Sequence, residues 1–306
     1  MRLAAILNPK AGGWARLQDA QDRQDPAAAV ARWLAPEAPE SVWTRETRAP
    51  GDGARLACEA LAQGYETLVA VGGDGTINAI VQGVQSAQAA DQVRLGLLPM
   101  GTANVLARVL EVPLEDPQAA ARIIRAGQER RIDLGRMGER WFVLVAGIGF
   151  DGAVTQAVNL GLKERIGEWA YVLAAARAAL SFPRCRVTLT LDGATPQEFD
   201  AYLVLVANGG RYAGQFLLSP EVSPSDGLLD VFVCLHRRPL ARAVAADALA
   251  LTRGHLDRAP GVRRFRARHI VLETDCPLPV ELDGDAAGQT PAIIEVVPNV
   301  LRVLVP

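Results

Sequence analysis

Over residues 1–131, short apolar runs alternate with longer stretches in which apolar positions recur at helical spacing. The runs 3–7, 42–44, 67–71 and 93–98 predict strands, and the stretches 27–34, 54–63, 76–84, 103–110 and 117–127 predict helices. The first run ends at Asn8-Pro9, a typical turn signal. Strand–helix alternation of this kind predicts a parallel sheet that is covered by helices on both faces.

The pattern changes near Ile132, where short β-rich segments begin to dominate. Strands are predicted at 141–145, 186–191, 202–206, 229–233, 263–272, 280–282, 293–297 and 300–305, and helices at 163–180 and 240–251. Several strands at short spacing predict a β-sandwich-like domain. We therefore expect an α/β domain over 1–131 and a β-rich domain over 132–297, with residues 298–306 returning to the first domain.

The composition restricts the classes of function. The chain has 306 residues, which is more than one compact core usually holds. Half of these residues are apolar. A net charge of -2 gives no electrostatic footprint for nucleic acid. There is no run of eighteen apolar residues, so we expect a cytoplasmic protein whose membrane contact is peripheral, at the inner surface. The oligomeric state, including a homodimer, stays open.

Four cysteines, Cys58, Cys185, Cys234 and Cys276, are widely spaced along the chain. None belongs to a CxxC motif or lies at ligand spacing from a histidine, so a metal site is not expected. The spacing favours unpaired buried thiols in a reducing cytosol.

Two glycine-rich stretches are candidates for a phosphate-binding turn. "GIGFDG", residues 147–152, matches GxGxxG after a strand, but the dinucleotide fingerprint also requires an acidic residue about 20 residues later, at the end of a second strand. The corresponding region around Glu168 is helix-like, so the match is weak. "VGGDGTIN", residues 71–78, is more specific, because it predicts a strand, a turn with three glycines and then a helix.

The turn at 72–75 can bind phosphate through its backbone. Glycines let N–H groups approach a ligand closely, and the N-terminus of the next helix adds the positive end of its dipole. Asp74 either faces a metal ion or nucleotide hydroxyl or only caps the helix. Similar turns follow two other strands, in "LNPKAGG" and "LLPMGTAN". Because the carboxyl ends of parallel strands share one edge, the three turns together predict a nucleotide-phosphate site.

Seven stretches occur in one order across nearly the whole chain: "NPKAGG", "GGDGTIN", "LPMGTANVLA", "GIGFDGAV", "ANGGRYAGQFLLSP", "SPSDGLLDV" and "ELDGD". They resemble the diacylglycerol kinase catalytic-domain family, in particular its soluble bacterial lipid kinases, which are related to sphingosine kinases and NAD kinases. The resemblance implies an α/β nucleotide domain followed by a β-rich domain. It also implies a phosphotransferase with ATP as donor, Mg²⁺ as cofactor and the alcohol group of a diacylglycerol-like lipid as acceptor.

Carried over residue by residue, the resemblance implies three sets of site residues. ATP contacts fall on Asn8, Pro9, Lys10, Ala11, Gly12, Thr47, Gly72, Gly73, Asp74, Gly75, Thr76, Ile77, Asn78 and Thr102. A structural Mg²⁺ is held by the Asp226 carboxylate and by the backbone carbonyls of Ser223 and Leu228, hard oxygen ligands that suit this ion. The catalytic residues are Asp74, which helps to hold Mg²⁺–ATP, and Asp285.

Asp285 marks one departure from the family. The family usually ends its catalytic motif in Asp-Gly-Glu, with the glutamate as general base, whereas this chain has Asp283-Gly284-Asp285. Asp285 keeps the carboxylate but is one methylene shorter, and a general base must lie within hydrogen-bond reach of the proton it takes. Without the resemblance, Asp285 is simply a turn aspartate. With the resemblance, we predict that it takes the proton of the acceptor hydroxyl.

Some alternatives stay open. If the chain is not an active lipid kinase, it is either a kinase homologue that binds nucleotide or lipid without turnover, or an NAD kinase-like nucleotide kinase. The expected partners are a lipid substrate and, peripherally, a membrane. Arg264, Arg266 and Arg268 share one face of a predicted strand, which is either a solvated face or a patch for anionic headgroups. The apolar stretch 168–182 either lines a lipid groove or forms a core helix.

Overall fold

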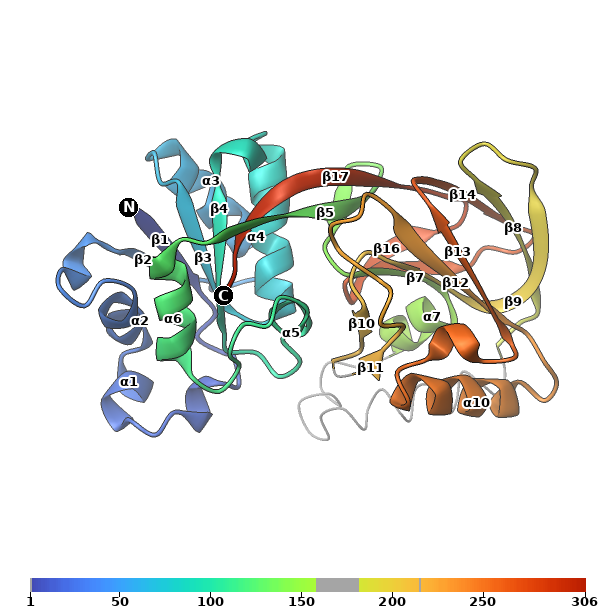
Figure 1. The fold of residues 1–306 in the computed structure, drawn as a ribbon, viewed down its shortest axis with the longest axis horizontal. Helices are drawn as coiled ribbons and strands as arrows, with labels where there is room; N and C mark the ends of the chain where they lie inside the picture. Colours follow the sequence, from blue (N-terminus) through green and yellow to red (C-terminus); the bar gives the residue numbers. More distant parts are fainter. Residues whose placement is uncertain (1, 158–181, 215) are drawn as a thin grey trace. The chain divides into compact units, whose positions relative to one another are not determined.

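The computed structural model describes residues 2–157, 182–214 and 216–306, which form two compact units (Figure 1). Unit 1 comprises Met1–Asp133, Ala213–Gln215 and Asn299–Pro306, and unit 2 comprises Leu134–Tyr212 and Phe216–Pro298. Unit 1 is an α/β structure with a parallel sheet, and unit 2 is rich in antiparallel strands. The fold class expected from the sequence is therefore confirmed.

The sheet of unit 1 has the strand order β17–β4–β3–β1–β2, and each pair of neighbours is parallel. Its strands are β1 (Leu3–Leu7), β2 (Trp43–Glu46), β3 (Thr67–Gly72), β4 (Arg94–Pro99) and the last part of β17 (Ala292–Leu304). β1 and β3 are buried along their whole length. This burial is typical of parallel strands that are covered on both faces.

Helices cover both faces of this sheet (Figure 1). They are α1 (Ala20–Gln24), α2 (Pro26–Leu34), α3 (Asp52–Ala62), α4 (Asp74–Ser86), α5 (Val105–Val109) and α6 (Pro117–Ala126). α3 packs on α4, and α2 packs on α6. The starts of α2 and α6 follow from local sequence, since an aspartate (Asp25 or Asp116) accepts a backbone N–H and a proline occupies the first turn.

Unit 2 consists of antiparallel strands, which all belong to one continuous sheet except β10 and β11, which pair only with each other. Its strands are β5 (Glu129–Met137, which begins in unit 1), β6 (Arg140–Phe142), β7 (Val145–Gly149), β8 (Cys185–Leu191), β9 (Gln197–Ala207), β10 (Arg211–Tyr212), β11 (Phe216–Leu217), β12 (Leu229–Leu235), β13 (Val262–Ala267), β14 (His269–Thr274), β15 (Pro279–Leu282), β16 (Asp285–Gln289) and the first part of β17. Its described helices are α7 (Phe150–Ala157) and α10 (Leu240–Thr252).

The long strand β9 is a branch point of this sheet, because it pairs with three other strands. Its second half pairs with β7, which leads on to β15 and β16, and its first half pairs with β8, which leads on to β14 and β17. Its other edge pairs with β12, and β12 pairs with β13. Side chains from these strands, such as Phe142, Val204 and Ile270, form one apolar core.

Three predictions about strands are wrong. The segment 141–145 is not one strand, because it spans the end of β6 and the first residue of β7. The segment 263–272 is not one strand, because β13 pairs with β12 whereas β14 pairs with β8 and β17. At the break, Asp192 Oδ1 accepts from the N–H groups of Arg268 (2.9 Å) and His269 (2.8 Å). Conversely, 293–297 and 300–305 belong to the single strand β17, in which Asn299 adopts a φ of 54° and donates its N–H to Asp133. The helix predicted at 163–180 and nearly all of the stretch 168–182 lie outside the described residues.

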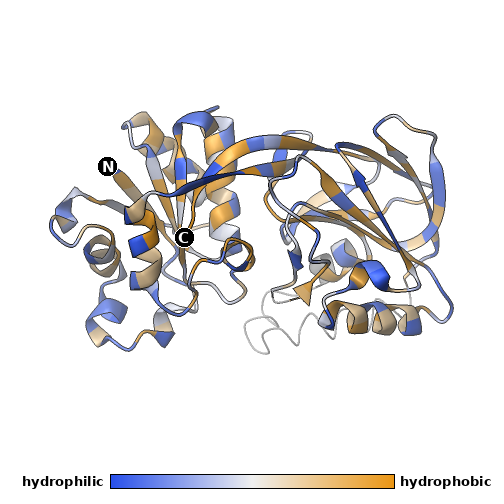
Figure 2. Ribbon diagram, viewed as in Figure 1, coloured by the Kyte–Doolittle hydropathy of each residue, from blue (hydrophilic) through white to orange (hydrophobic). Residues whose placement is uncertain are grey.

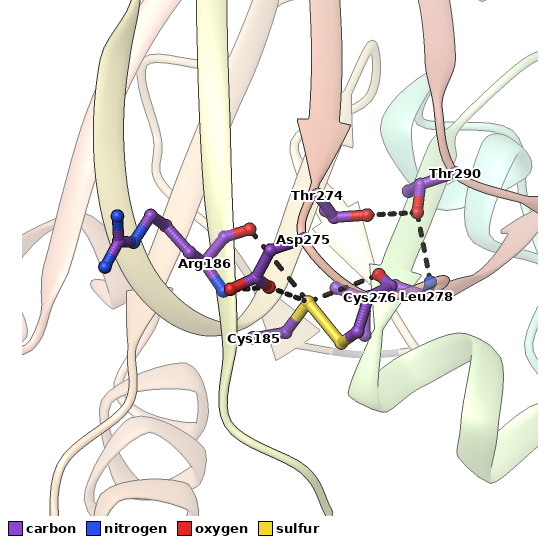
Figure 3. The surroundings of a disulfide bond; sticks show 7 residues. All are labelled: Cys185, Arg186, Thr274, Asp275, Cys276, Leu278 and Thr290. Carbon is purple, nitrogen blue, oxygen red and sulfur yellow. Dashed lines mark hydrogen bonds between the residues drawn. A yellow bond between two sulfur atoms is a disulfide. The ribbon is translucent and has the colours of Figure 1, made fainter.

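The prediction of four unpaired thiols is also wrong. Cys185 in β8 and Cys276, just after β14, form a disulfide, and their Cα atoms lie 5.9 Å apart (Figure 3). Their sequence separation of 91 conceals this proximity, which arises because β8 and β14 are paired neighbours. Asp275 Oδ1 accepts from the N–H of Arg186 at 2.8 Å and fixes the adjacent chain. Cys58 and Cys234 are free.

None of the described helices is both long and apolar enough to cross a membrane. Apolar residues are concentrated on the central strands of each unit, which form the two cores (Figure 2).

Candidate active site

The three predicted phosphate-binding turns follow β1, β3 and β4 in unit 1. Because β1 pairs with β3 and β3 pairs with β4, all in parallel, the turns lie at one edge of the sheet. Open α/β sheets bind ligands outside this carboxyl edge. Thr47, which follows β2, joins the same edge, since its N–H donates to the carbonyl of Leu7 at 2.7 Å.

Backbone hydrogen bonds hold the three turns against one another. The carbonyl of Gly72 accepts from the N–H groups of Met100 at 2.9 Å and Gly101 at 3.2 Å. The N–H of Gly13 donates to the carbonyl of Met100 at 2.7 Å. The turns are therefore one continuous backbone surface, as a site built from several loops requires.

Two glycines allow this close approach. A Cβ on Gly101 would lie 2.5 Å from the Cα of Gly73, and a Cβ on Gly13 would lie 2.6 Å from the carbonyl oxygen of Met100. Both distances are far below van der Waals contact, so neither position has room for a side chain.

Asp74 connects the second turn to the third. Its Oδ2 accepts from the N–H of Val105 at 2.9 Å, and its Oδ1 accepts from the N–H of Leu106 at 3.0 Å. These donors belong to the first turn of α5, where N–H groups have no partner within the helix. Asp74 therefore caps α5 and not α4, which begins at Asp74 itself. Each carboxylate oxygen keeps a second lone pair, so this partly buried group can still face a metal ion.

Asn104 shapes the third turn, and no role was predicted for it from the sequence. Its Oδ1 accepts from the N–H of Gly101, and its Nδ2 donates to the Gly101 carbonyl, both at 2.9 Å. The residue is buried and has a φ of 47°, a left-handed conformation that asparagine tolerates better than most residues. The sequence signal that could have indicated this role is the asparagine that directly follows Gly101-Thr102-Ala103.

The residues predicted to contact ATP divide into two groups. Exposed or half-buried are Asn8, Pro9, Lys10, Ala11, Gly12, Thr47, Gly73, Asp74, Gly75 and Thr102, whereas Gly72, Thr76, Ile77 and Asn78 are buried. Ile77 is 5% exposed and belongs to the core, and Asn78 Oδ1 accepts from Gln82 at 2.6 Å. Thr76, Ile77 and Asn78 thus belong to the buried face of α4.

In unit 2, the predicted catalytic turn joins β15 to β16. Asp283 and Gly284 have φ values of 49° and 91°, as the two central residues of a type I′ hairpin turn require. The Asp283 carboxylate accepts from the N–H groups of residues 143–145 at 2.7, 2.9 and 3.0 Å, which anchors the turn to the start of β7. Asp285 is the exposed first residue of β16. The anchoring role of Asp283 was not predicted, because its partners are far away in sequence.

The loop predicted to hold a structural Mg²⁺ is organised by an ion pair. Asp226 Oδ2 accepts from the guanidinium of Arg266, and its Oδ1 accepts from the N–H of Leu228 at 3.1 Å. Ser223 Oγ lies 3.4 Å from the N–H of Ser225. The oxygen donors are of the right kind for Mg²⁺, but the carboxylate is already neutralised. The residues do not fit the ion in this arrangement, and we derive no step from a metal here.

Two arginines of β13, Arg264 and Arg266, bind carboxylates. Arg264 exposes 14% of its side chain and lies 2.6 Å from Asp230 and 2.5 Å from Glu221. Arg266 pairs with Asp226. These contacts neutralise Arg264 and Arg266, so neither a solvated face nor a patch for anionic headgroups describes Arg264 correctly.

The molecule thus consists of an α/β unit, whose turns meet at one edge of a parallel sheet, and a β-rich unit. Family models agree with this division. Residues 2–137 match the diacylglycerol kinase catalytic domain, and residues 144–305 match the YegS C-terminal NAD kinase beta sandwich-like domain. The chain belongs to this family of diacylglycerol kinases and YegS-like lipid kinases, as the resemblance predicted.

Curated relatives support the assignment. A diacylglycerol kinase of Bacillus subtilis is 31% identical over 81% of this chain and 80% of its own length. A diacylglycerol kinase of Mycobacterium tuberculosis is 32% identical over 83% of this chain and 82% of its own length. A probable YegS-like lipid kinase of Pseudomonas aeruginosa is 32% identical over 88% of this chain and 86% of its own length.

Solved structures show the same fold. A diacylglycerol kinase from Bacillus anthracis matches with a TM-score of 0.78 and 24% identity, covering 100% of this chain and 97% of that one. An NAD kinase from Archaeoglobus fulgidus, solved in complex with ATP, matches with a TM-score of 0.54 and 13% identity, covering 99% of this chain and 93% of that one.

Proposed function

We propose that this protein transfers the γ-phosphate of ATP to the hydroxyl group of a diacylglycerol-like lipid. The observation that supports this most is the joining of three glycine turns at one sheet edge, with Asp74 bridging the second and third. Backbone N–H groups and a helix N-terminus there suit the phosphates of a nucleotide. Family membership favours a lipid acceptor over a nucleotide acceptor.

The proposed mechanism assigns positioning to unit 1 and proton transfer to unit 2. Phosphoryl transfer depends mainly on orientation and charge neutralisation. The turns around Gly73 and Gly101 would cradle the phosphates of ATP, and the outward lone pairs of Asp74 would hold the Mg²⁺ that accompanies it. When bound, Mg²⁺ supplies positive charge to the phosphates. Asp285, which is exposed, would take the proton of the acceptor hydroxyl.

Incubation with γ-³²P-ATP and Mg²⁺ tests the proposed reaction. The acceptors are diacylglycerol, monoacylglycerol, phosphatidylglycerol and sphingosine in mixed micelles, with NAD in solution as the nucleotide alternative. We expect label in a glycerolipid and none in NAD. Label in NAD alone would assign the protein to the nucleotide kinases. No label in any acceptor, together with ATP binding in a calorimetric titration, would favour a homologue that binds without turnover.

We also propose that unit 2 contacts an anionic membrane surface through α10. The inner side of α10 buries Leu240, Ala243 and Asp247. The opposite side exposes alanines and Leu249, which is 51% exposed. Asp247 is the only acidic residue of the helix, and its carboxylate is bound by Tyr202 at 2.8 Å and Arg237 at 3.0 Å. The outer face of α10 therefore presents apolar side chains and no carboxylate.

Four exposed arginines lie in α10 or close to it in the sequence and would attract anionic lipid: Arg238, Arg242, Arg253 and Arg258. An apolar helix face flanked by basic residues is typical of a helix that lies in a membrane interface. Each arginine near an anionic surface contributes about 1 kcal/mol, or about fivefold in affinity.

Vesicle flotation tests this contact. We expect stronger binding to vesicles that contain phosphatidylglycerol than to pure phosphatidylcholine vesicles, and an Arg242→Ala variant should bind the anionic vesicles about fivefold more weakly. Arg186→Ala is the matched control, because Arg186 is an exposed arginine of β8, away from α10 in the sequence. Equal binding to both vesicle types, or an equal loss in both variants, would contradict the assignment to α10.

A further inference from the structure

Unit 2 contains a pair of neighbouring carboxyl groups that the proposed mechanism does not use. Asp151, in the first turn of α7, is half-buried, and Glu281, in β15, is 2% exposed. Asp151 Oδ2 and Glu281 Oε1 face the same point, since both would lie within 2.5 Å of a Cβ on Gly147. The hydroxyl of Tyr212, in β10, donates to Asp151 Oδ1 at 2.5 Å. Asp151 belongs to the "GIGFDG" stretch, which the sequence analysis had set aside as a weak cofactor motif.

The pair needs a proton to exist in this form. Two carboxylates have only acceptor oxygens, so a hydrogen bond between them requires that one is protonated. Burial raises the pKa of Glu281 well above its ordinary value, and the neighbouring charge of Asp151 raises it further. Burial likewise raises the pKa of Asp151. The proximity of the two groups and the two raised pKa values therefore favour a carboxylic acid that is hydrogen-bonded to a carboxylate.

The backbone is shaped to accommodate this pair. Gly147, in β7, faces both carboxyl groups, and a Cβ there would lie 2.3 Å from Asp151 Oδ2 and 2.5 Å from Glu281 Oε1. No side chain fits at this position, so the glycine provides the space in which the two groups meet.

Glu281 also holds the catalytic turn. Its second oxygen, Oε2, accepts from the N–H of Gly284 at 2.5 Å. Gly284 is the residue immediately before Asp285, and it has a left-handed φ of 91°. Asp283 anchors the other side of the same turn through three hydrogen bonds to residues 143–145. The position of Asp285 is thus set by two acidic side chains, one of which faces Asp151.

We propose that the Asp151–Glu281 pair is a positioning device for Asp285, and that loss of the shared proton at alkaline pH releases the turn and lowers the rate of phosphoryl transfer. When both groups are charged, their repulsion separates them, and Glu281 can no longer hold Gly284 in place. The proposal rests on the proposed role of Asp285 as a base. Asp151 and Glu281 are positioning residues, because they act through the turn.

Among the described elements that contact the pair, β10 carries a positive charge, Arg211, next to Tyr212. Tyr212 is neutral over the relevant range, since burial raises its pKa well above the ordinary value. Asp283 adds a negative charge to the field at Glu281, and Cys234 of β12 interacts with Tyr212. The packed strand β7 (Val-Ala-Gly-Ile-Gly) has no titratable side chain, and β16 contributes only Asp285. In β9, which also packs against α7, the titratable residues are Glu198, Asp200 and Tyr202.

A Glu281→Gln variant tests the proposal through the pH dependence of turnover. Glutamine keeps an acceptor for Gly284 and gains an amide donor for Asp151, but it has no proton to lose. We expect turnover within a few-fold of the wild type at neutral pH, and the alkaline fall in turnover shifted upward by at least one pH unit. Asp151→Asn should produce the same shift, because its amide can donate to Glu281. A Glu281→Leu variant should lower turnover at every pH without changing the Kd for ATP.

Glu273→Gln is the matched control, since Glu273 is an exposed carboxylate of β14, and its pH profile should follow the wild type. If the alkaline falls of Glu281→Gln and the wild type coincide, the proposal is wrong.

A second measurement separates this result from a failure of the proposed function. A carboxyl with a raised pKa in the folded state loses stabilisation as pH rises from the ordinary value toward the folded value. The melting temperature of the wild type minus that of Glu281→Gln should therefore decrease as the pH rises from 5 into the range in which turnover falls, whether or not the protein is active. A constant difference would also overturn the proposal.

Discussion

Replacing Asp285 with asparagine is expected to lower the turnover of lipid phosphorylation by about 10²- to 10⁴-fold, the usual contribution of general acid–base catalysis. Asparagine has nearly the same shape but cannot take the proton of the acceptor hydroxyl. The fold should be unaffected, because Asp285 is exposed and the turn before it is held by Asp283 and Glu281. The Kd for ATP should stay unchanged, since the predicted ATP contacts lie in unit 1. Steady-state turnover and calorimetric titration measure the two quantities.

An Asp285→Glu variant addresses the shorter side chain of this chain. It restores the length found in the family, and turnover equal to or above the wild type would show that the carboxylate at this position acts on the substrate. Glu273→Gln removes a different exposed carboxylate and should leave turnover unchanged. Undiminished turnover in Asp285→Asn would remove the assignment and require another base.

Loss of the Cys185–Cys276 disulfide is expected to reduce the free energy of unfolding of unit 2 by about 4 kcal/mol. The bond closes a loop over a sequence separation of 91 residues, and the loss of chain entropy in the unfolded state grows with loop length. Urea unfolding of Cys276→Ser should therefore show a lower midpoint than the wild type. The wild type in reductant should shift to the same midpoint.

Cys58→Ser is the control for this measurement, because Cys58 is a free thiol in α3 of unit 1. Its unfolding should match the wild type in both conditions. If reductant leaves the wild-type midpoint unchanged, the two cysteines are not bonded in solution.

The sequence predicted the three turns because their signal is local. Gly72, Gly73 and Gly101 follow apolar strands directly, and parallel strands place such turns at one edge. Their convergence could therefore be inferred without coordinates. The start of α4 was placed two residues late, at Thr76, because Asp74 and Gly75 are weak helix formers. Both residues belong to α4. From the first turn of this helix, the Asp74 carboxylate accepts two N–H groups of α5.

Long-range polar partners were not predictable from the pattern. Asp151 and Glu281 are separated by a large part of the chain, and an acidic residue in a β-rich segment normally indicates exposure. Glu281 is buried beside Asp151, and the absence of a side chain at Gly147 leaves room for both groups. Likewise, Arg264 was interpreted as a surface residue because its partner Asp230 comes from the neighbouring strand β12. Such pairs become visible only when the strand register is known.

The strand β17 limits how the protein can be dissected into separately expressed pieces. Its first part pairs with β14 in unit 2, and its end pairs with β4 in unit 1 through Arg302 and Val303. A piece that stops at Asp133 would lack this strand and leave the buried edge of β4 unpaired, a template for aggregation. An N-terminal fragment for nucleotide-binding work therefore has to carry residues 299–306, for example joined through a short linker.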